Sequence, residues 1–379
     1  MWKKYLIMCC AVAAGAAFAA VPGEIPKEVN SQLEWVKCAP MPLGKADPEK
    51  HPHIPELRGV VFLYTRADES DSLIAMLENA RRGFNGKVLI AVVTPDNVSD
   101  AEVLQSRHRD SRLRIGVDLE RKIIPEFMRG GSMILPAGFL LDREGRVLWR
   151  GEAMDLPEAA GKALEGKLDW KVQKEIFPLT DQLQRSLREG SMMPILRTAE
   201  RIFALEPGNP SALRMAVFAA ESLRNEKLAW DVTMRQMQKC QEQPRISFTA
   251  LELILRHRSL RGNLPGLIGD FAKRSFLPRM RYAFADILLR HFPFDIDAVL
   301  GAKQILAGTP LALNAQPAEM AVVLALRARL LYALGDLPGA EAAQAEAVQL
   351  FSRSPDHAGR QEAEKMLKFF RTLLQESKK

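Results

Sequence analysis

Cysteine is scarce in this chain of 379 residues, which contains four. Two of them, Cys9 and Cys10, lie close to the N-terminus, and the others are Cys38 and Cys240. No cysteine occurs between Cys38 and Cys240, so that stretch cannot supply the thiol pair that dithiol redox chemistry requires. Two such distant cysteines also exclude the dense disulfide framework of a small secreted domain.

Motifs of common enzymes and of metal sites are also missing. The sequence has no G-x-S-x-G elbow, no Walker loop and no G-x-G-x-x-G fingerprint. Among its six histidines, His51 and His53 stand together around Pro52. Without a neighbouring cysteine or an H-E-x-x-H pattern, this pair indicates a surface loop rather than a metal site. We therefore predict no cofactor and no metal.

Aromatic residues make up only 7% of the chain, and the net charge is a modest +7. Arginines gather around residues 107–114 and 256–281. RNA-binding surfaces combine such charge with aromatics on which bases stack, and these are sparse here, so we predict no nucleic-acid partner. His257, which stands between two arginines, is interpreted as part of a solvated basic helix face.

The N-terminus has the order of a secretory signal peptide. Lys3 and Lys4 precede an apolar stretch that ends in Ala17-Phe18-Ala19, an A-x-A cleavage site. We predict a signal peptide over residues 1–19, a linker over 20–32, and a periplasmic or secreted mature chain. No later stretch is long and apolar enough for a transmembrane segment.

A lipid anchor at Cys9 or Cys10 is the less favoured alternative for the same segment. Leu6-Ile7-Met8-Cys9 only loosely resembles a lipoprotein signal. Met8 is a poor residue before a lipidated cysteine, and the apolar core continues past Cys10.

The first half of the chain alternates apolar runs with helical patterns. Short apolar runs bounded by turn residues predict buried strands, and Leu73, Ile74 and Leu77 share one face of a predicted helix. Arg143-Glu144-Gly145 predicts the turn of a hairpin. The predicted strands are 59–64, 87–93, 137–142 and 146–150, and the predicted helices are 70–82 and 99–107. Together they predict an α/β domain with a βαβ unit and an antiparallel edge.

This half resembles the TlpA/ResA branch of the thioredoxin-like proteins over about residues 30–165. Leu33-Glu34-Trp35-Val36 looks like the family's opening strand. Residues 135–147 are similar to its G-I-P-T-T-F-L-I-D-x-x-G-R-I stretch. The resemblance implies a thioredoxin-like domain over 33–168, with a central mixed sheet and flanking helices. It also implies a cis peptide bond before Pro136, facing the active site.

The chain departs from this family where the family carries its W-C-x-x-C motif. The matching stretch is 65–72, and Glu69 and Ser72 fall nearest the two cysteine positions. A carboxylate and a hydroxyl can cap a helix, but they cannot exchange disulfides. We therefore expect a redox-inactive domain without catalytic residues.

Two binding functions stay open at this position. Asp68, Glu69 and Asp71 are oxygen ligands that could hold a cation, although an acidic start is also what a solvated helix favours. Alternatively, the loop formed by Leu135, Pro136 and Ala137 could hold an extended peptide along the edge of the fold. We favour the peptide.

The second half of the chain is predicted to be helical. Residues 325–350 resemble a tetratricopeptide repeat, with Ala328, Ala340 and Ala347 at positions where two helices press together. Residues 203–210 resemble the end of another repeat. We predict a repeat-like domain over 175–352, irregular between 245 and 315, and a capping helix over 356–377. An ordinary helical bundle is the alternative.

These features lead to two hypotheses of function. The first is an exported adaptor or scaffold that binds a protein or peptide of the cell envelope. The second is a thiol-disulfide oxidoreductase of the TlpA/ResA type that uses the atypical Cys38 and Cys240. Export permits a disulfide between these two cysteines, with two separate buried thiols as the alternative.

Overall fold

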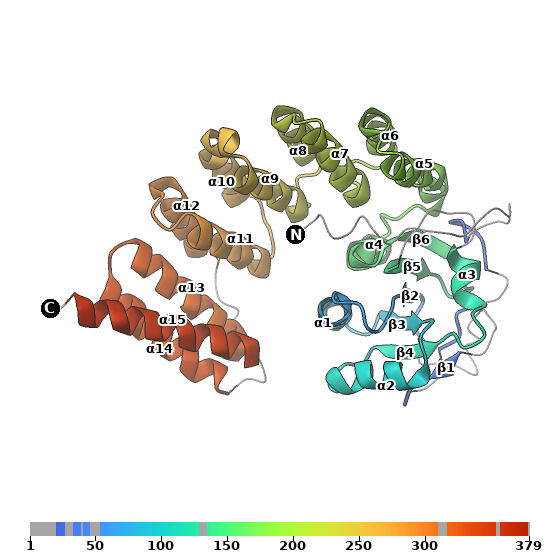
Figure 1. Cartoon of the computed structure of the whole chain (residues 1–379), viewed down its shortest axis with the longest axis horizontal. Coiled ribbons are helices and arrows are strands. Elements are labelled where there is room, and N and C mark those ends of the chain that lie inside the picture. Colours follow the sequence, from blue (N-terminus) through green and yellow to red (C-terminus); the bar gives the residue numbers. More distant parts are fainter. Residues whose placement is uncertain are drawn as a thin grey trace. The chain divides into compact units, whose positions relative to one another are not determined.

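The computed structural model describes residues 20–26, 33–38, 41–45, 54–128, 135–309, 317–353 and 357–377 (Figure 1). The predicted signal peptide and the pair His51 and His53 lie outside these residues, as do Cys9 and Cys10. Within the described residues, no helix has the length and apolar character needed to cross a membrane. The chain divides into two compact units, residues 1–219 and 220–379.

A six-stranded mixed sheet forms the centre of the first unit, in the order β1-β4-β3-β2-β5-β6 (Figure 1). Strands β2, β3 and β4 are parallel, whereas β5 runs antiparallel to β2, β6 to β5, and β1 to β4. The strands are β1 Glu34–Trp35, β2 Leu57–Phe62, β3 Val88–Thr94, β4 Arg114–Val117, β5 Ala137–Leu141 and β6 Val147–Glu152. This topology is that of a thioredoxin-like domain, as the sequence predicted.

Helices cover both faces of the sheet because successive residues of each strand point to opposite sides. Val61 and Leu63 belong to the core cluster beneath α1, α2 and α4. Val60 and Phe62 belong to the opposite cluster, which includes residues of α3 and the 41–43 segment. The helices are α1 Ser70–Gly83, α2 Val98–Arg107, α3 Ile123–Met128 and α4 Leu156–Leu164.

The first unit extends past the sheet into helices α5 Trp170–Arg188, α6 Met192–Leu205 and most of α7 Pro210–Ser222. The Arg150 guanidinium of β6 lies 4.5 Å from the Phe177 ring of α5. Arg214 of α7 donates to the buried Asp155, with bonds of 3.1 and 2.7 Å. These contacts connect the sheet to the first helices.

The second unit is helical throughout its described residues. Between α13 and α14, the side chains of Ala328, Ala340 and Ala347 are fully buried, which lets the two backbones approach closely. Gly335 has a φ of +85°, and Asp336 caps α14 by accepting from the Gly339 N–H at 2.9 Å. The helices are α8 Glu226–Lys239, α9 Pro244–Arg256, α10 Leu264–Lys273, α11 Pro278–His291, α12 Ile296–Ala307, α13 Pro317–Ala333, α14 Leu337–Phe351 and α15 His357–Glu376.

Candidate functional site

The start of α1 and the Pro136 loop meet at one edge of the sheet. Phe62, the last residue of β2, pairs with Ala137, the first residue of β5. The chain that enters α1 therefore leaves the sheet beside the loop that enters β5. The Leu135–Pro136 peptide bond is cis, as the family resemblance implies. The structure thus brings together the two segments that the sequence analysis singled out.

The positions that match the missing cysteines have capping and surface roles. Glu69 is the N-cap residue of α1, but its side chain makes no capping hydrogen bond. Ser72 Oγ donates to the Glu69 carbonyl at 2.8 Å, and the buried Ser70 donates to the Tyr64 carbonyl at 2.6 Å. Both hydroxyls are therefore engaged with the backbone, and within the described part of the chain neither bonds to a histidine or carboxylate that would activate it.

Two side chains from the α2 C-terminus, Arg107 and His108, contact Asp71 at the start of α1. Arg107 Nη1 donates to Asp71 Oδ2, and His108 Nε2 lies 2.7 Å from Asp71 Oδ1. Arg107 Nη2 also donates to the Thr65 carbonyl at 3.3 Å. Both carboxylate oxygens of Asp71 already contact side-chain nitrogens, one of Arg107 and one of His108. This argues against the cation site considered from the sequence. No group of three or more histidine, cysteine or acidic side chains among the described residues is placed to hold a metal.

Asp96 fixes the turn between β2 and α1. Its Oδ2 atom accepts from Thr65 N at 2.6 Å, from Thr65 Oγ1 at 2.7 Å and from Thr94 Oγ1 at 3.1 Å. Both threonines are buried, so the carboxylate satisfies donors that would otherwise be unpaired inside the protein. These contacts fix the conformation of the turn.

Large apolar side chains are exposed along the same edge. Tyr64 follows β2, Leu119 follows β4 and Met154 follows β6, and all three strands end at this edge. Their exposed fractions are 52%, 55% and 50%. Leu135 and Pro136 are partly exposed beside them, whereas Ala137 is fully buried in the core. We name Tyr64, Leu119, Leu135, Pro136 and Met154 the apolar edge; the side chain of Ala137 is not available to a peptide.

Cys38 lies away from this edge. It follows β1, and its Sγ contacts the Ile115 carbonyl at 3.8 Å, near the opposite end of β4. Strand β4 is two strand spacings from β2, about 10 Å. Burial raises the pKa of the Cys38 thiol, although the Ile115 carbonyl contact and the charge of Arg114 act against this rise. A thiol with a raised pKa in this position is a poor nucleophile.

Cys240 belongs to the second unit, where it is the C-cap residue of α8 and is partly buried. Cys38 belongs to the first unit. A disulfide between the two therefore stays a prediction.

A small cavity lies where α4 meets α6 and α7. It is lined by Trp149, Lys162, Glu206 and Asn209, among others, and has a volume of about 10 Å³. That is room for one water molecule at most. Lys162 Nζ donates to Glu206 at 2.8 Å across it, so this cluster is a structural ion pair rather than a substrate site.

The sequence analysis found neither the contacts of Arg107 and His108 with Asp71 nor the apolar edge. Arg107 was assigned to a crowded basic loop and Tyr64 to a buried strand, while His108, Leu119 and Met154 were given no role. The available signal was positional, since each of the three apolar residues comes two residues after the end of a strand, and all three strands end at the same edge.

The chain was compared with protein families, curated proteins and solved structures, and only solved structures are similar to it. No protein-family model matches the chain, and no curated protein does. Similar solved structures include the bacterioferritin comigratory protein of Xanthomonas campestris, at 17% identity, with 40% of this chain and 100% of that chain covered and a TM-score of 0.31.

Two further solved structures are similar over about a third of this chain. DsbF of MTB has 10% identity, with 34% of this chain and 88% of that chain covered and a TM-score of 0.27. A protein of Chlorobium tepidum that carries the name thiol:disulfide interchange protein DsbE has 15% identity, with 31% and 84% covered and a TM-score of 0.27. At these scores the fold assignment depends on the sheet topology described above.

Proposed function

We propose that this chain is an exported adaptor whose thioredoxin-like domain binds an extended peptide segment of an envelope protein and transfers no electrons. The observation that carries the proposal is the start of α1, where the Arg107–Asp71 ion pair, the His108 contact and a serine hydroxyl bonded to the backbone occupy the place of a reactive thiol. The apolar edge beside it supplies side chains for binding. The helical second unit contributes a further protein-binding surface of the repeat type.

The oxidoreductase hypothesis has less support. It requires Cys38 or Cys240 to act at the apolar edge. Cys38 lies toward the other end of the sheet, and burial raises the pKa of its thiol. No observation in the described residues favours it.

An insulin-reduction assay on the chain without residues 1–19 tests the absence of redox activity. We expect no turnover above background. The matched positive control is the double variant Glu69→Cys, Ser72→Cys, which places two thiols in C-x-x-C spacing at the start of α1. Turnover by the parent chain that disappears on mutation of Cys38 or Cys240 would establish the oxidoreductase hypothesis instead.

Binding is tested by screening the same chain against peptides from envelope proteins. For a peptide that binds, the double variant Tyr64→Ser, Leu119→Ser should weaken binding roughly ten-fold or more, because two exposed apolar side chains lose their contact with the ligand. Val103→Ser, at a 54% exposed position on α2, is the control and should leave binding unchanged. Equal loss in both variants would refute binding at the apolar edge. Export is tested by N-terminal sequencing, which should begin at Ala20.

A further inference from the structure

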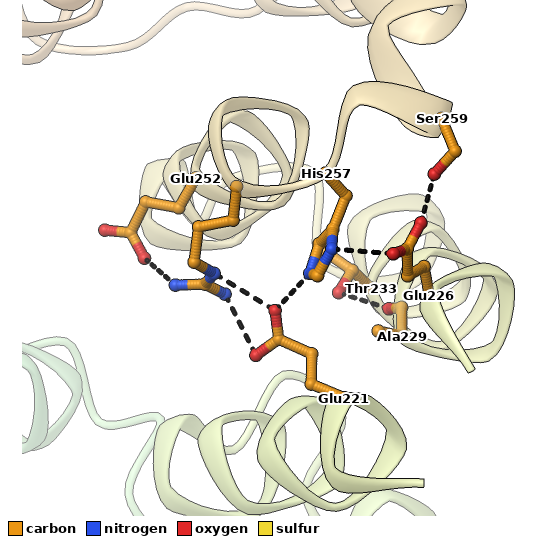
Figure 2. Close-up of polar contacts among 8 residues, drawn as sticks. Glu221, Glu226, Ala229, Thr233, Glu252, His257 and Ser259 are labelled. Carbon is orange, nitrogen blue, oxygen red and sulfur yellow. Dashed lines mark hydrogen bonds and ion pairs between the residues drawn. The ribbon is translucent and has the colours of Figure 1, made fainter. Parts of the chain in front are cut away.

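His257 lies between two carboxylates in the second unit (Figure 2). Its Nε2 atom is 2.5 Å from Glu221 Oε1, and its Nδ1 atom is 3.0 Å from Glu226 Oε1. The side chain is 19% exposed. The sequence-based interpretation of a solvated basic face is therefore wrong for this residue, because the acidic partners come from elsewhere in the chain.

The three residues belong to different helices. Glu221 is in the last turn of α7, Glu226 is the first residue of α8, and His257 directly follows α9. The imidazole ring thus joins the α7–α8 turn to the end of α9. Figure 2 shows the ring reaching across from one helical pair to the next.

Both contacts can be hydrogen bonds only when the ring is protonated. Neutral imidazole has one N–H group, and its other nitrogen is an acceptor that faces a carboxylate oxygen unfavourably. Imidazolium donates from both nitrogens. We propose that His257 is a pH-responsive joint, which connects the α7–α8 turn to α9 through two bonds when protonated and through one when neutral.

Other charged groups surround the ring. Arg256 of α9 donates to Glu221 at 3.0 and 3.3 Å, and it lies 3.8 Å from Glu252. Glu221 therefore keeps a cationic partner when the histidine is neutral, whichever of the two histidine bonds is lost.

Glu226 has one more partner, Ser259 of the 3₁₀ helix η3 Arg258–Asn263. The hydrogen bond from Ser259, followed by the charge and the hydrogen bond of His257, lowers the pKa of the Glu226 carboxyl. The other cations on these elements are exposed to solvent. They are Arg224 in the α7–α8 turn, Lys227 on α8, and Arg258 and Arg261 on η3. The Arg261 guanidinium lies 5.9 Å from the centre of the Phe292 ring.

The direction of the effect follows from these contacts. The joint is complete at a pH where the imidazole is charged and both glutamates are ionised, and it loses one bond as the pH rises and the ring loses its proton. In stacked helical pairs, contacts between neighbours determine the curvature of the stack. Protonation of His257 would therefore stiffen this junction.

The test is hydrogen–deuterium exchange on the full chain at about pH 5 and about pH 8, comparing the parent with His257→Gln at each pH. Comparison at the same pH cancels the intrinsic pH dependence of exchange. Peptides covering residues 222–228 and 257–262 should exchange about two- to five-fold more slowly in the parent than in the variant at the lower pH, and the difference should shrink at the higher pH. His291→Gln, at an exposed position on α11, is the control and should show no such pattern.

Glu226→Gln separates the joint from a general loss of structure. The amide side chain that this substitution introduces has both an acceptor and donors, so it can satisfy Nδ1 of either form of the ring. This variant should keep the junction protected and remove the pH dependence. Protection that is independent of pH in the parent, or a pH dependence that persists in Glu226→Gln, would overturn the proposal.

Discussion

Glu78 on α1 connects that helix to the segment before β4. Its carboxylate accepts from Arg81 at 3.0 and 2.7 Å, from Arg82 at 3.1 Å, and from the Arg112 N–H at 3.1 Å. The side chain is 8% exposed. Desolvation acts to raise the pKa of this carboxyl, but the hydrogen bonds from Arg81, Arg82 and Arg112 outweigh it and lower the pKa to about 2.

The perturbation is Glu78→Gln, which keeps the shape and removes the charge. A shift of the pKa from 4.5 to about 2 corresponds to about 3 kcal/mol of folding free energy. Because the folded-state pKa is depressed, this stability is present above the unfolded pKa and is lost as the pH falls from about 4.5 toward 2. We therefore expect Glu78→Gln to destabilise the first unit by about 2 to 3 kcal/mol at neutral pH and by almost nothing near pH 2.

The assay is urea unfolding of the full chain at a series of pH values, with hydrogen exchange of the β3 segment as the probe of the first unit. Glu102→Gln is the control, since its ion pair with Lys37 at 3.5 Å is exposed and such pairs contribute at most about 1 kcal/mol. A neutral-pH cost for Glu78→Gln no larger than that of Glu102→Gln would refute the reasoning. So would a cost that does not decline on acidification.

Two further predictions concern the buried Arg58 and the partly buried Cys38, both in the first unit. Arg58 is fully buried, donates to the carbonyls of Gly44 and Asp142 at 2.7 and 2.5 Å, and has a pKa lowered to about 10 by desolvation. Arg58→Met should destabilise this unit by about 3 kcal/mol in thermal unfolding, because the carbonyls lose their donor. A loss of stability no larger than that of Lys87→Met, at an exposed position, would contradict this. Because burial raises the pKa of the Cys38 thiol, iodoacetamide at neutral pH should label Cys38 more slowly in the folded chain than in urea, as followed by mass spectrometry; equal rates would show an accessible, reactive thiol.

Most strands and helices of the sheet domain were predictable because their patterns are local. The predicted strand 87–93 and helix 70–82 correspond to β3 Val88–Thr94 and α1 Ser70–Gly83. Strand β4 was missed because it has four residues, begins with Arg114 and contains Gly116, so it carries no extended apolar run. Its place in the sheet comes from pairing with β3, which is a tertiary effect.

The candidate site was only partly predictable, for the same reason. Glu69, Ser72 and Pro136 were found because a family motif places them. The contacts of Asp71 with Arg107 and His108 span more than thirty residues, and nothing in the spacing of those residues signals the contact. His257 was misjudged for the same reason, because its local neighbours are arginines while its partners Glu221 and Glu226 lie on other helices.

The charges at the start of α1 also explain what kind of ligand the adjacent edge suits. A helix N-terminus attracts an anion, and here Asp71 is already that anion. The Arg107 guanidinium in turn pairs with Asp71, so this carboxylate is already engaged and offers no free charge to a ligand. At this edge, the exposed apolar side chains of Tyr64, Leu119 and Met154 are then the groups that gain free energy when a ligand buries them. A peptide with apolar side chains fits this edge better than an acidic or phosphorylated one, because its affinity would come from desolvation rather than from ion pairs.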